Sequence, residues 1–396
     1  MLSPEDKQFI KEHLSDDVRR LALKTSSFFP PDANSKFILQ QIAGRQQIRH
    51  KIPTWYQLDD IVYPQRLSLE QCSSEATAKY KASLLSGDSF ADLTGGFGVD
   101  TAFISQKFTF SDYIEKQSEL AEIAKHNFSV LSLKTGVHNE DGKDYLQQMK
   151  HVDWIYLDPA RRSDSGGKTV LIEDCDPNLL DIQDLLMKNA DGVLLKLSPM
   201  LDIRAALTVL KNVQEIHVVS VENECKEILF LLQKDIQGDA PVVCVNIDKY
   251  GEYQSVIFHL ADEKNSVISY TDKIGAYIYE PNVSILKAGY FKGTAFRYNL
   301  NKLHPDSHLY TSSELVTDFP GRIFLTESVF SPNKKEMAQA LSDINQANIS
   351  VRNFPFSVAE LRKKWKIKEG GEIYLFATTL ANGSYRIIKA RKLTFP

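Results

Sequence analysis

A glycine-rich turn between a short strand and a helix constrains the fold of this chain more than any other feature of its sequence. Residues 90–100 read FADLTGGFGVD: an apolar strand ends at Asp92, and the segment DTAFISQKF, which can start a helix, follows the turn. Three glycines in four positions let the backbone turn sharply and approach a ligand more closely than a side chain would permit. The free amides at the helix start favour an electron-rich ligand group. The segment therefore predicts a strand–turn–helix site of the kind that binds nucleotides.

Two common nucleotide-binding signatures do not fit this turn. A dinucleotide fingerprint, G-x-G-x-x-G/A, starting at Gly96 would need glycine or alanine at the position of Thr101. A phosphate-binding loop would need Lys followed by Ser or Thr after the turn, and that pair is missing. The pattern from Asp92 to Gly98 is acidic-x-x-G-G-x-G. It resembles motif I of the class I S-adenosylmethionine (SAM)-dependent methyltransferases, with Thr94 in place of the usual first glycine.

A second acidic residue ends the next apolar segment. The strand-like run from Asp112 ends at Glu115, and SELAEIAKHNF reads as a helix after it. A carboxylate at the tip of the second strand lies beside the glycine turn and can accept both ribose hydroxyls of a nucleoside. The alternative is an ordinary acidic residue at a helix N-terminus, where the helix dipole stabilises it. Because the spacing after the glycine turn suits a nucleoside site, we favour the ribose-binding interpretation.

A third strand runs into an Asp-Pro pair. Residues 154–159 read WIYLDP and resemble motif IV, the D/N-P-P-x element, so the resemblance implies Asp158 and Pro159 as catalytic residues. Asp141 and Gly142 stand where motif III of this family meets the adenine. The resemblance thus implies SAM as the cofactor, bound by Asp92, Thr94, Gly95, Gly96, Gly98, Glu115, Asp141 and Gly142.

The same resemblance implies the fold class. It covers roughly residues 85–260 and implies an α/β architecture, a Rossmann-like seven-stranded sheet with helices on both faces. The ligand is then expected at the C-terminal ends of the strands, as in other open α/β sheets. A hairpin at 249–252 is expected to close the sheet edge, and a helix is expected over about 222–234.

Length and composition agree with a cytoplasmic enzyme of several domains. The chain has 396 residues, enough for two or more domains, and 43% of them are hydrophobic, enough for large cores. No stretch reaches the ~18–20 apolar residues of a membrane span, and the N-terminus lacks the basic and apolar regions of a signal peptide. The four cysteines are widely spaced and form no C-x-x-C pair, which argues against a zinc site and a disulfide framework.

Charge is distributed unevenly along the chain. The net charge is −4, but the segment from Val351 to Pro396 holds ten basic and three acidic residues. That segment carries +7 and the remainder −11, which suggests a basic docking surface for phosphates on an acidic body. The alternative is a solvated helix face, particularly for LRKKWKIK, which contains Lys363 and Lys364. We predict RNA as a partner and these two lysines as substrate-binding residues.

The chain divides into four predicted regions. Residues 1–85 form a helical region and 86–262 the methyltransferase domain. Residues 275–320 resemble the ferredoxin-like domain, and 321–396 the THUMP-like domain, of an uncharacterised bacterial methyltransferase group. The segments KIPTW, LEQCSSEATAKYKA and DPARR match the same group. True THUMP domains accompany RNA-modifying enzymes, so the resemblance implies an RNA partner by analogy.

The chemistry expected at Asp158 is an in-line methyl transfer. In the base methyltransferases that the motif resembles, this residue accepts a hydrogen bond from an exocyclic amine, guanine N2 or adenine N6, and can also draw off its proton. The sequence departs from the family after Pro159, where Ala160, Arg161 and Arg162 replace a second proline and a stacking aromatic residue. Arginine can stack on a base or clamp a phosphate, or pair with nearby acidic residues. Arg161 and Arg162 are candidate substrate-binding residues.

Three functions remain open from the sequence. The first is methylation of an exocyclic base nitrogen in structured RNA, either rRNA or tRNA. The second is methylation of a small molecule or a protein, with C-terminal domains that serve only for packing or dimerisation. The third is a non-catalytic SAM-binding scaffold that uses the basic segment for binding.

Overall fold

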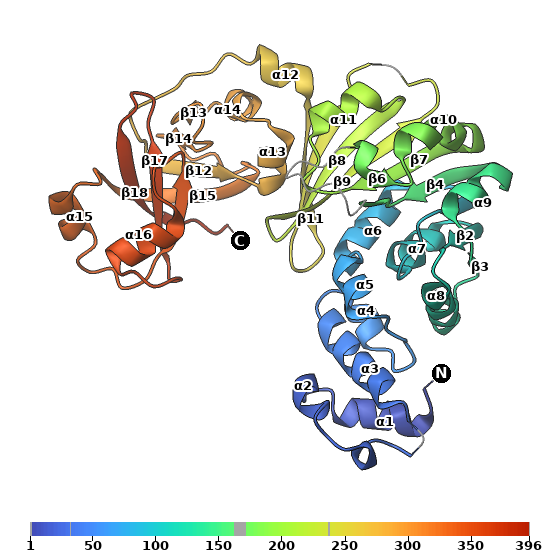
Figure 1. Cartoon of the computed structure of the whole chain (residues 1–396). Coiled ribbons are helices and arrows are strands. Elements are labelled where there is room, and N and C mark those ends of the chain that lie inside the picture. Colours follow the sequence, from blue (N-terminus) through green and yellow to red (C-terminus); the bar gives the residue numbers. More distant parts are fainter. Residues whose placement is uncertain (1, 32, 162–171, 237, 396) are drawn as a thin grey trace. The chain divides into compact units, whose positions relative to one another are not determined.

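The chain forms two compact units. The computed structural model describes residues 2–31, 33–161, 172–236 and 238–395, whose helices and strands are drawn in Figure 1. The first unit comprises Met1–Ile216 and Glu227–Gly238, and the second His217–Lys226 and Asp239–Pro396. None of the helices within the described ranges has the length and hydropathy that a membrane crossing requires.

The N-terminal region of the first unit is helical. Its helices are α1 (Pro4–Glu12), α2 (Val18–Leu21), α3 (Ser35–Ile48), α4 (Pro53–Tyr56), α5 (Arg66–Gln71) and α6 (Glu75–Leu84). A capping box starts α1, because the Ser3 hydroxyl accepts the Asp6 N–H at 3.1 Å and the Asp6 carboxylate accepts the Ser3 N–H at 2.9 Å. Ser74 caps α6 by accepting the Thr77 N–H at 3.3 Å.

Strands and helices then alternate along the chain. The elements are β1 (Ser89–Asp92), α7 (Val99–Ile104), β2 (Phe110–Ile114), α8 (Ser118–Val130), β3 (Gly136–His138), α9 (Gly142–Gln148), β4 (Val152–Leu157), α10 (Leu179–Asn189), β7 (Ala190–Leu197), α11 (Ile203–Val209), β8 (Val213–Val221), β9 (Glu224–Gln233), β10 (Pro241–Ile247) and β11 (Tyr253–His259). The short strands β5 (Ala160–Arg161) and β6 (Cys175–Asp176) pair with each other. This alternation produces the α/β class that the motifs predict.

The large sheet has nine strands among the described residues, not the predicted seven. Its order is β11-β10-β8-β9-β7-β4-β1-β2-β3. β1 pairs in parallel with β2 and β4, and β4 with β7, whereas β9 runs antiparallel to β7. The antiparallel pair β10 and β11 ends the sheet, as the hairpin at 249–252 predicts.

The helix predicted over 222–234 is wrong, because most of this segment forms strand β9. Residues 227–232 are buried without interruption, and Leu231 lies opposite Leu194 of β7. A short continuous apolar run suits a strand covered on both faces as well as a buried helix, and periodicity does not separate the two. Here the antiparallel pairing with β7 makes the segment a strand.

The C-terminal part of the chain forms a second sheet. Its elements are α12 (Leu260–Asn265), β12 (Tyr277–Pro281), α13 (Val283–Ala288), α14 (Lys292–Arg297), β13 (Asn301–Lys302), β14 (Tyr310–Ser312), β15 (Gly321–Phe330), α15 (Lys334–Ala340), β16 (Asn348–Arg352), α16 (Val358–Trp365), β17 (Ile373–Thr379) and β18 (Tyr385–Lys392). The strand order is β13-β14-β12-β15-β18-β17-β16. One sheet therefore joins strands from both C-terminal segments, since β12 pairs with β15.

Candidate active site

A cavity of about 710 Å³ lies at the C-terminal ends of β1, β2 and β4. The residues that the sequence assigns to catalysis and cofactor binding all line it: Asp92, Thr94, Gly95, Gly96, Gly98, Glu115, Asp141, Gly142, Asp158 and Pro159. The chain thus brings together four segments from positions 92 to 159, because parallel strands end at one edge of the sheet.

Two of the four predicted substrate-binding residues, Lys363 and Lys364, are not part of this lining. Arg162 lies outside the described residues, and Arg161 is placed only as the end of β5. Lys363 and Lys364 are exposed on α16, in the second unit. Their roles in substrate binding stay predictions.

The three glycines of the turn are needed for different reasons. A Cβ atom on Gly95 would lie 2.2 Å from the Tyr113 ring, and one on Gly98 would lie 2.9 Å from the Phe128 ring, so packing excludes side chains at both. Gly96 has a φ of +55° and no neighbouring atom nearer than 3.8 Å to such a Cβ. Its backbone conformation favours glycine, and the space beside it is open. Of the three, Gly96 best fits a close approach to a ligand.

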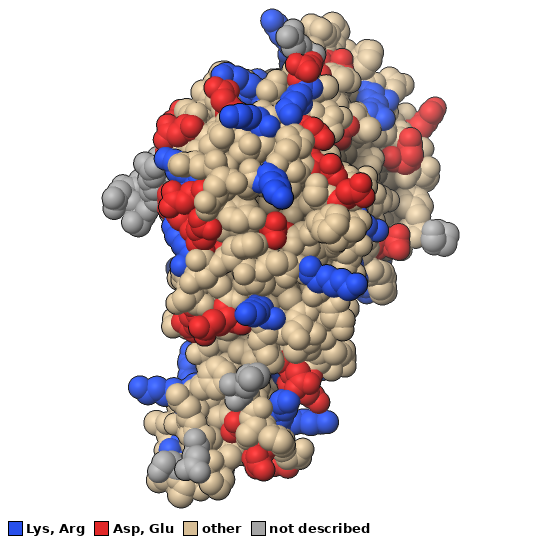
Figure 2. Space-filling model, turned by 90° about the vertical axis from the view of Figure 1, so that its right-hand side faces the viewer, with Lys and Arg blue, Asp and Glu red and all other residues tan. Residues whose placement is uncertain are grey.

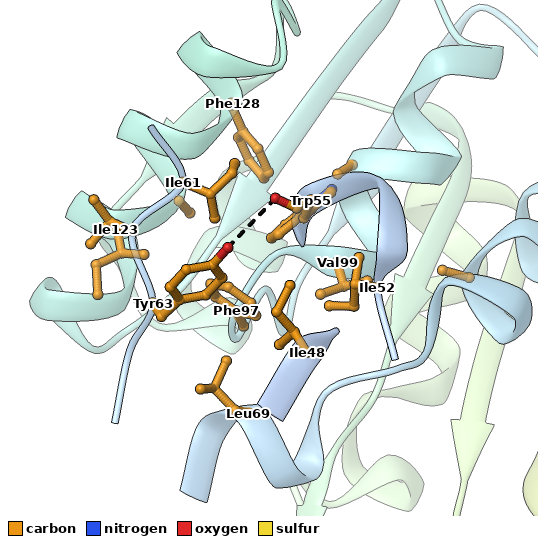
Figure 3. Close-up of a cluster of buried hydrophobic side chains, with 14 of the residues drawn as sticks. Ile48, Ile52, Trp55, Ile61, Tyr63, Leu69, Phe97, Val99, Ile123 and Phe128 are labelled. Carbon is orange, nitrogen blue, oxygen red and sulfur yellow. Dashed lines mark hydrogen bonds between the residues drawn. The ribbon is translucent and has the colours of Figure 1, made fainter. Parts of the chain in front are cut away.

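The turn rests on the N-terminal helical region. Figure 3 shows Ile48, Ile52 and Trp55 packed around Phe97 of the turn. The Phe97 and Trp55 rings meet edge to face, with 5.1 Å between their centroids. Residues from α3 and α4 therefore belong to the core that supports the candidate cofactor site.

Glu115 fixes the conformation of the turn. One of its carboxylate oxygens accepts the Gly96 N–H at 2.8 Å, and the other accepts the Gln117 N–H at 2.8 Å. Each oxygen has two lone pairs, so both keep capacity for a further donor such as a ribose hydroxyl. The predicted ribose-binding role is compatible with this arrangement, although the carboxylate also has a structural one.

Thr94, which replaces the usual first glycine, connects two motifs. Its hydroxyl accepts the Asp158 N–H at 2.7 Å and lies 3.4 Å from a carboxylate oxygen of Asp92. Asp92 also accepts hydrogen bonds from the Thr94 N–H at 2.9 Å and from the Thr101 hydroxyl. Burial raises the pKa of Asp92 to about 7, although the bonds from Thr101 and Thr94 oppose that shift. The departure from the family pattern thus has a structural function, since it ties the start of the catalytic element to the turn.

Motif III ends at the start of α9. The Asp141 carboxylate caps this helix by accepting the Lys143 N–H at 2.8 Å. A Cβ on Gly142 would lie 2.1 Å from the Leu93 carbonyl oxygen, so only glycine lets α9 approach the end of β1. Upstream of the turn, Gln71 and Ser73 also line the cavity.

Sequence reasoning missed Lys196. This residue lies on β7, lines the cavity and forms an ion pair with Asp158. Its side chain is 12% exposed and that of Asp158 is 37% exposed. A single charged residue within the apolar strand VLLKL is a detectable signal, because an unpaired lysine is rarely buried.

A second group of buried charges lies beneath this pair. Lys81 is fully buried, and its ammonium group lies 2.7 Å from both carboxylate oxygens of Glu227 and 3.2 Å from Asp100. Asp100 also accepts hydrogen bonds from the Tyr156 hydroxyl at 2.6 Å and the Ser73 hydroxyl at 2.7 Å. Although burial opposes ionisation, Lys81 and Lys196 lower the pKa of Asp100. The cavity floor is thus a connected, charged network.

The described residues contain no group of three or more His, Cys, Asp or Glu side chains suited to holding a metal ion. No disulfide links the four cysteines, all of which lie in the described ranges, and Cys175 and Cys244 are buried.

Comparisons with known families agree with the C-terminal architecture. Residues 277–320 match the model of a ferredoxin-like domain, and residues 321–392 match that of a THUMP domain-like family. No curated protein matches the chain.

Solved structures similar to this chain include methyltransferases. The crystal structure of a candidate methyltransferase from Porphyromonas gingivalis W83 is 35% identical, covers all of both chains and has a TM-score of 0.88. A candidate class I SAM-dependent methyltransferase from Listeria monocytogenes is 11% identical over 62% of this chain and 93% of its own, with a TM-score of 0.38. An rRNA methylase from Streptococcus thermophilus is 13% identical over 40% of this chain and 94% of its own, with a TM-score of 0.30.

The large α/β sheet, with a cavity at the ends of its parallel strands, defines a class I methyltransferase fold. The chain belongs to the same family as the Porphyromonas protein, a methyltransferase family, and its own C-terminal segments match ferredoxin-like and THUMP-like domains. The predicted family, fold class and enzyme class are thereby confirmed.

Proposed function

We propose that this protein transfers the methyl group of SAM to structured RNA in the cytoplasm. The observation that carries the proposal is the convergence of the glycine turn, Glu115 and Asp158 on one cavity. Its volume of about 710 Å³ lies within the range of small-molecule sites. Bound SAM would supply an electrophilic methyl group on a sulfonium centre.

The residues of the cavity fit this cofactor. Gly96 leaves open space where a side chain would otherwise stand, and Glu115 keeps acceptor capacity for ribose hydroxyls. Asp141 and Gly142 lie at the wall where the family pattern places the adenine. Because these groups are held by backbone hydrogen bonds and packing, the chain itself mainly positions the reacting groups, which can contribute ~7–11 kcal/mol to a transfer reaction.

RNA is the proposed substrate because of the C-terminal segment. Residues 321–392 match the THUMP domain-like family and hold 13 basic and 6 acidic residues, a net charge of +7 in a chain whose net charge is −4. On α16 and just after it, Lys363, Lys364, Lys366 and Lys368 are exposed and form no ion pair with another described residue. By contrast, basic and acidic side chains are interspersed on the face that Figure 2 shows, the right-hand side of Figure 1. We therefore expect the C-terminal domain to contact RNA phosphates. Arg161 and Arg162, which belong to the methyltransferase domain, are further candidates for substrate contacts.

The Asp158-Pro159 pattern taken alone supports an exocyclic base nitrogen as the acceptor. A carboxylate at this position can accept a hydrogen bond from the amine and orient its lone pair toward the methyl group. Methylation of a small molecule or a protein, and a scaffold without activity, are the competing functions.

The test is transfer of tritiated methyl groups from SAM into a lysate of a strain that lacks the protein. The lysate is fractionated into RNA, protein and small molecules after the reaction. Label in RNA that disappears with Asp158→Ala and persists with Asp184→Ala, an exposed aspartate on α10, supports the proposal. Label confined to protein or small molecules contradicts the RNA substrate, and SAM binding without any label supports the scaffold.

A further inference from the structure

The cation of Lys196, which lies beside Asp158, bears on which methyl acceptor the site can bind. The two side chains form an ion pair within the cavity lining, and the carboxylate is the more exposed partner. We propose that the methyl acceptor is the 2′-hydroxyl of a ribose in RNA, which Lys196 and Asp158 bind and activate together. This proposal rests on the proposed function, of which it specifies the acceptor atom.

Lys196 is held as a cation. Burial opposes its charge, but Asp158, Asp100 and Glu227 raise its pKa above the usual value for lysine. The last two belong to the network on the cavity floor, where Lys81 lies between them. The structure therefore fixes a positive charge beside the carboxylate, at the place where the acceptor must come.

A fixed cation at this place disfavours an amine as the acceptor. An exocyclic amine gains positive charge as its nitrogen attacks a methyl group, and a neighbouring ammonium destabilises that charge. Moreover, one Asp158 oxygen already accepts from Lys196, which leaves less capacity for the N–H groups of an amine.

The described lining also offers no exposed aromatic ring on which a flipped base could stack. Its aromatic residues are Phe97 and Tyr156, which are 4% and 1% exposed. Phe97 packs against Trp55, and the Tyr156 hydroxyl donates to Asp100. Base recognition in single-stranded RNA usually uses stacking on exposed aromatic or guanidinium planes. In the sequence, Ala160 stands in place of the second proline of the family element, and Arg161, whose side chain lies outside the described part of the structure, in place of the aromatic residue.

A hydroxyl acceptor uses both members of the pair. Lys196 donates a hydrogen bond to the hydroxyl oxygen and stabilises the negative charge that develops there. The hydroxyl proton passes to the free oxygen of Asp158. The oxygen forms its new bond to the methyl carbon while the carbon–sulfur bond breaks, and the electron pair of that bond leaves with the sulfur as a neutral thioether. No further reactant is needed.

The experiment is nucleoside analysis of RNA labelled by the wild-type protein. RNA from a strain lacking the protein is incubated with the enzyme and tritiated SAM, digested to nucleosides and separated by chromatography with mass detection. Label in a 2′-O-methylnucleoside supports the proposal. Label in a base-methylated nucleoside overturns it but leaves the RNA methyltransferase intact. Label absent from RNA overturns the proposed function as well, so the two failures are distinguishable.

Variants at position 196 test the role of the cation. Lys196→Met is expected to lower kcat by about 100-fold, the usual effect of losing one charge-stabilising donor, while the Kd for SAM changes little. Lys196→Arg keeps the charge and is expected to retain more activity than Lys196→Met. Lys188→Met, at an exposed lysine on α10, is the matched control and is expected to keep full activity. If Lys196→Met binds SAM normally and methylates RNA at the wild-type rate, the proposal is wrong.

A site-specific change in the RNA gives an independent readout. Once the labelled nucleotide is mapped, a synthetic RNA with a 2′-deoxy sugar at that nucleotide is expected to accept no methyl group. Methylation of the deoxy RNA at the same nucleotide overturns the proposal, whatever the stability of the protein variants.

Discussion

Asp158 in the first unit and Glu280 in the second are both paired with cations. In the first pair the carboxylate is the more exposed partner, whereas in the second cluster the cations are the more exposed partners. The Asp158 side chain is 37% exposed and its partner Lys196 is 12% exposed. The Glu280 side chain is 2% exposed, whereas its partners Arg322 and Arg352 are each 33% exposed. The first cluster presents a carboxylate to a cavity, and the second buries a carboxylate beneath two guanidinium groups.

The difference separates a chemical role from a structural one. Glu280 on β12 lies opposite Arg322 on β15, and Arg352 from β16 reaches the same carboxylate at 2.8 Å. The buried carboxylate therefore connects three strands of one sheet. Among the described residues, Asp158 connects fewer elements, and its second carboxylate oxygen accepts no hydrogen bond from another of them, which leaves it for a ligand.

The largest expected effect is the loss of activity in Asp158→Ala. Methyl transfer is expected to fall on the order of a thousandfold, because proton transfer and orientation are lost together. The melting temperature and the Kd for SAM are expected to change little, since the side chain is partly exposed and has no assigned role in cofactor binding. Single-turnover rates and calorimetric SAM binding check this. An unchanged rate would support the scaffold instead of the enzyme.

The opposite result is expected at Glu280. Glu280→Gln removes the charge between two arginines, and breaking a buried ion pair usually costs about 3–5 kcal/mol in free energy of unfolding. Denaturant unfolding, with hydrogen exchange to locate the loss in β12 and β15, measures it. SAM binding is expected to be unaffected. Glu314→Gln, at an exposed glutamate of the same unit, is the control. A loss below about 1 kcal/mol would show that this pair resembles an ordinary surface ion pair.

The sequence predicts the residues of the site that lie at strand ends, but not the buried charged residues next to them. Asp92, Glu115 and Asp158 are recognisable because each ends an apolar strand, and parallel strands bring their ends together. Lys81 and Glu227 are 146 positions apart and meet only through tertiary packing. The incorrect helix over 222–234 also hid Glu227, because a strand at that place points it toward Lys81. Local periodicity thus locates the cofactor wall but not the charges beneath it.

A smaller effect should distinguish two adjacent glycines of the turn. Gly95→Ala forces a methyl group into the Tyr113 ring, and such overpacking typically costs about 1–3 kcal/mol. The methyl group of Gly96→Ala enters open space. The expected loss of stability is therefore only the cost of a non-glycine residue in the left-handed backbone conformation, about 1 kcal/mol. Gly96→Ala should nevertheless weaken SAM binding more than Gly95→Ala does, because its added methyl group takes up open space at the cavity lining. Thermal unfolding and calorimetric SAM titration of both variants test the two halves of this prediction. Equal SAM affinities would argue against contact between Gly96 and the cofactor.

The smallest expected effect concerns Thr94, where this chain departs from its family pattern. Thr94→Gly restores the usual residue but removes the hydroxyl that accepts the Asp158 N–H, a net loss of about 1 kcal/mol. Because that bond positions the catalytic element, kcat should fall more than SAM affinity does. Thr94→Ser keeps the hydroxyl and should retain kcat, which makes it the matched control. If Thr94→Gly were as active as the wild type, the hydroxyl would be dispensable, and the position of Asp158 would depend on its ion pair with Lys196 instead.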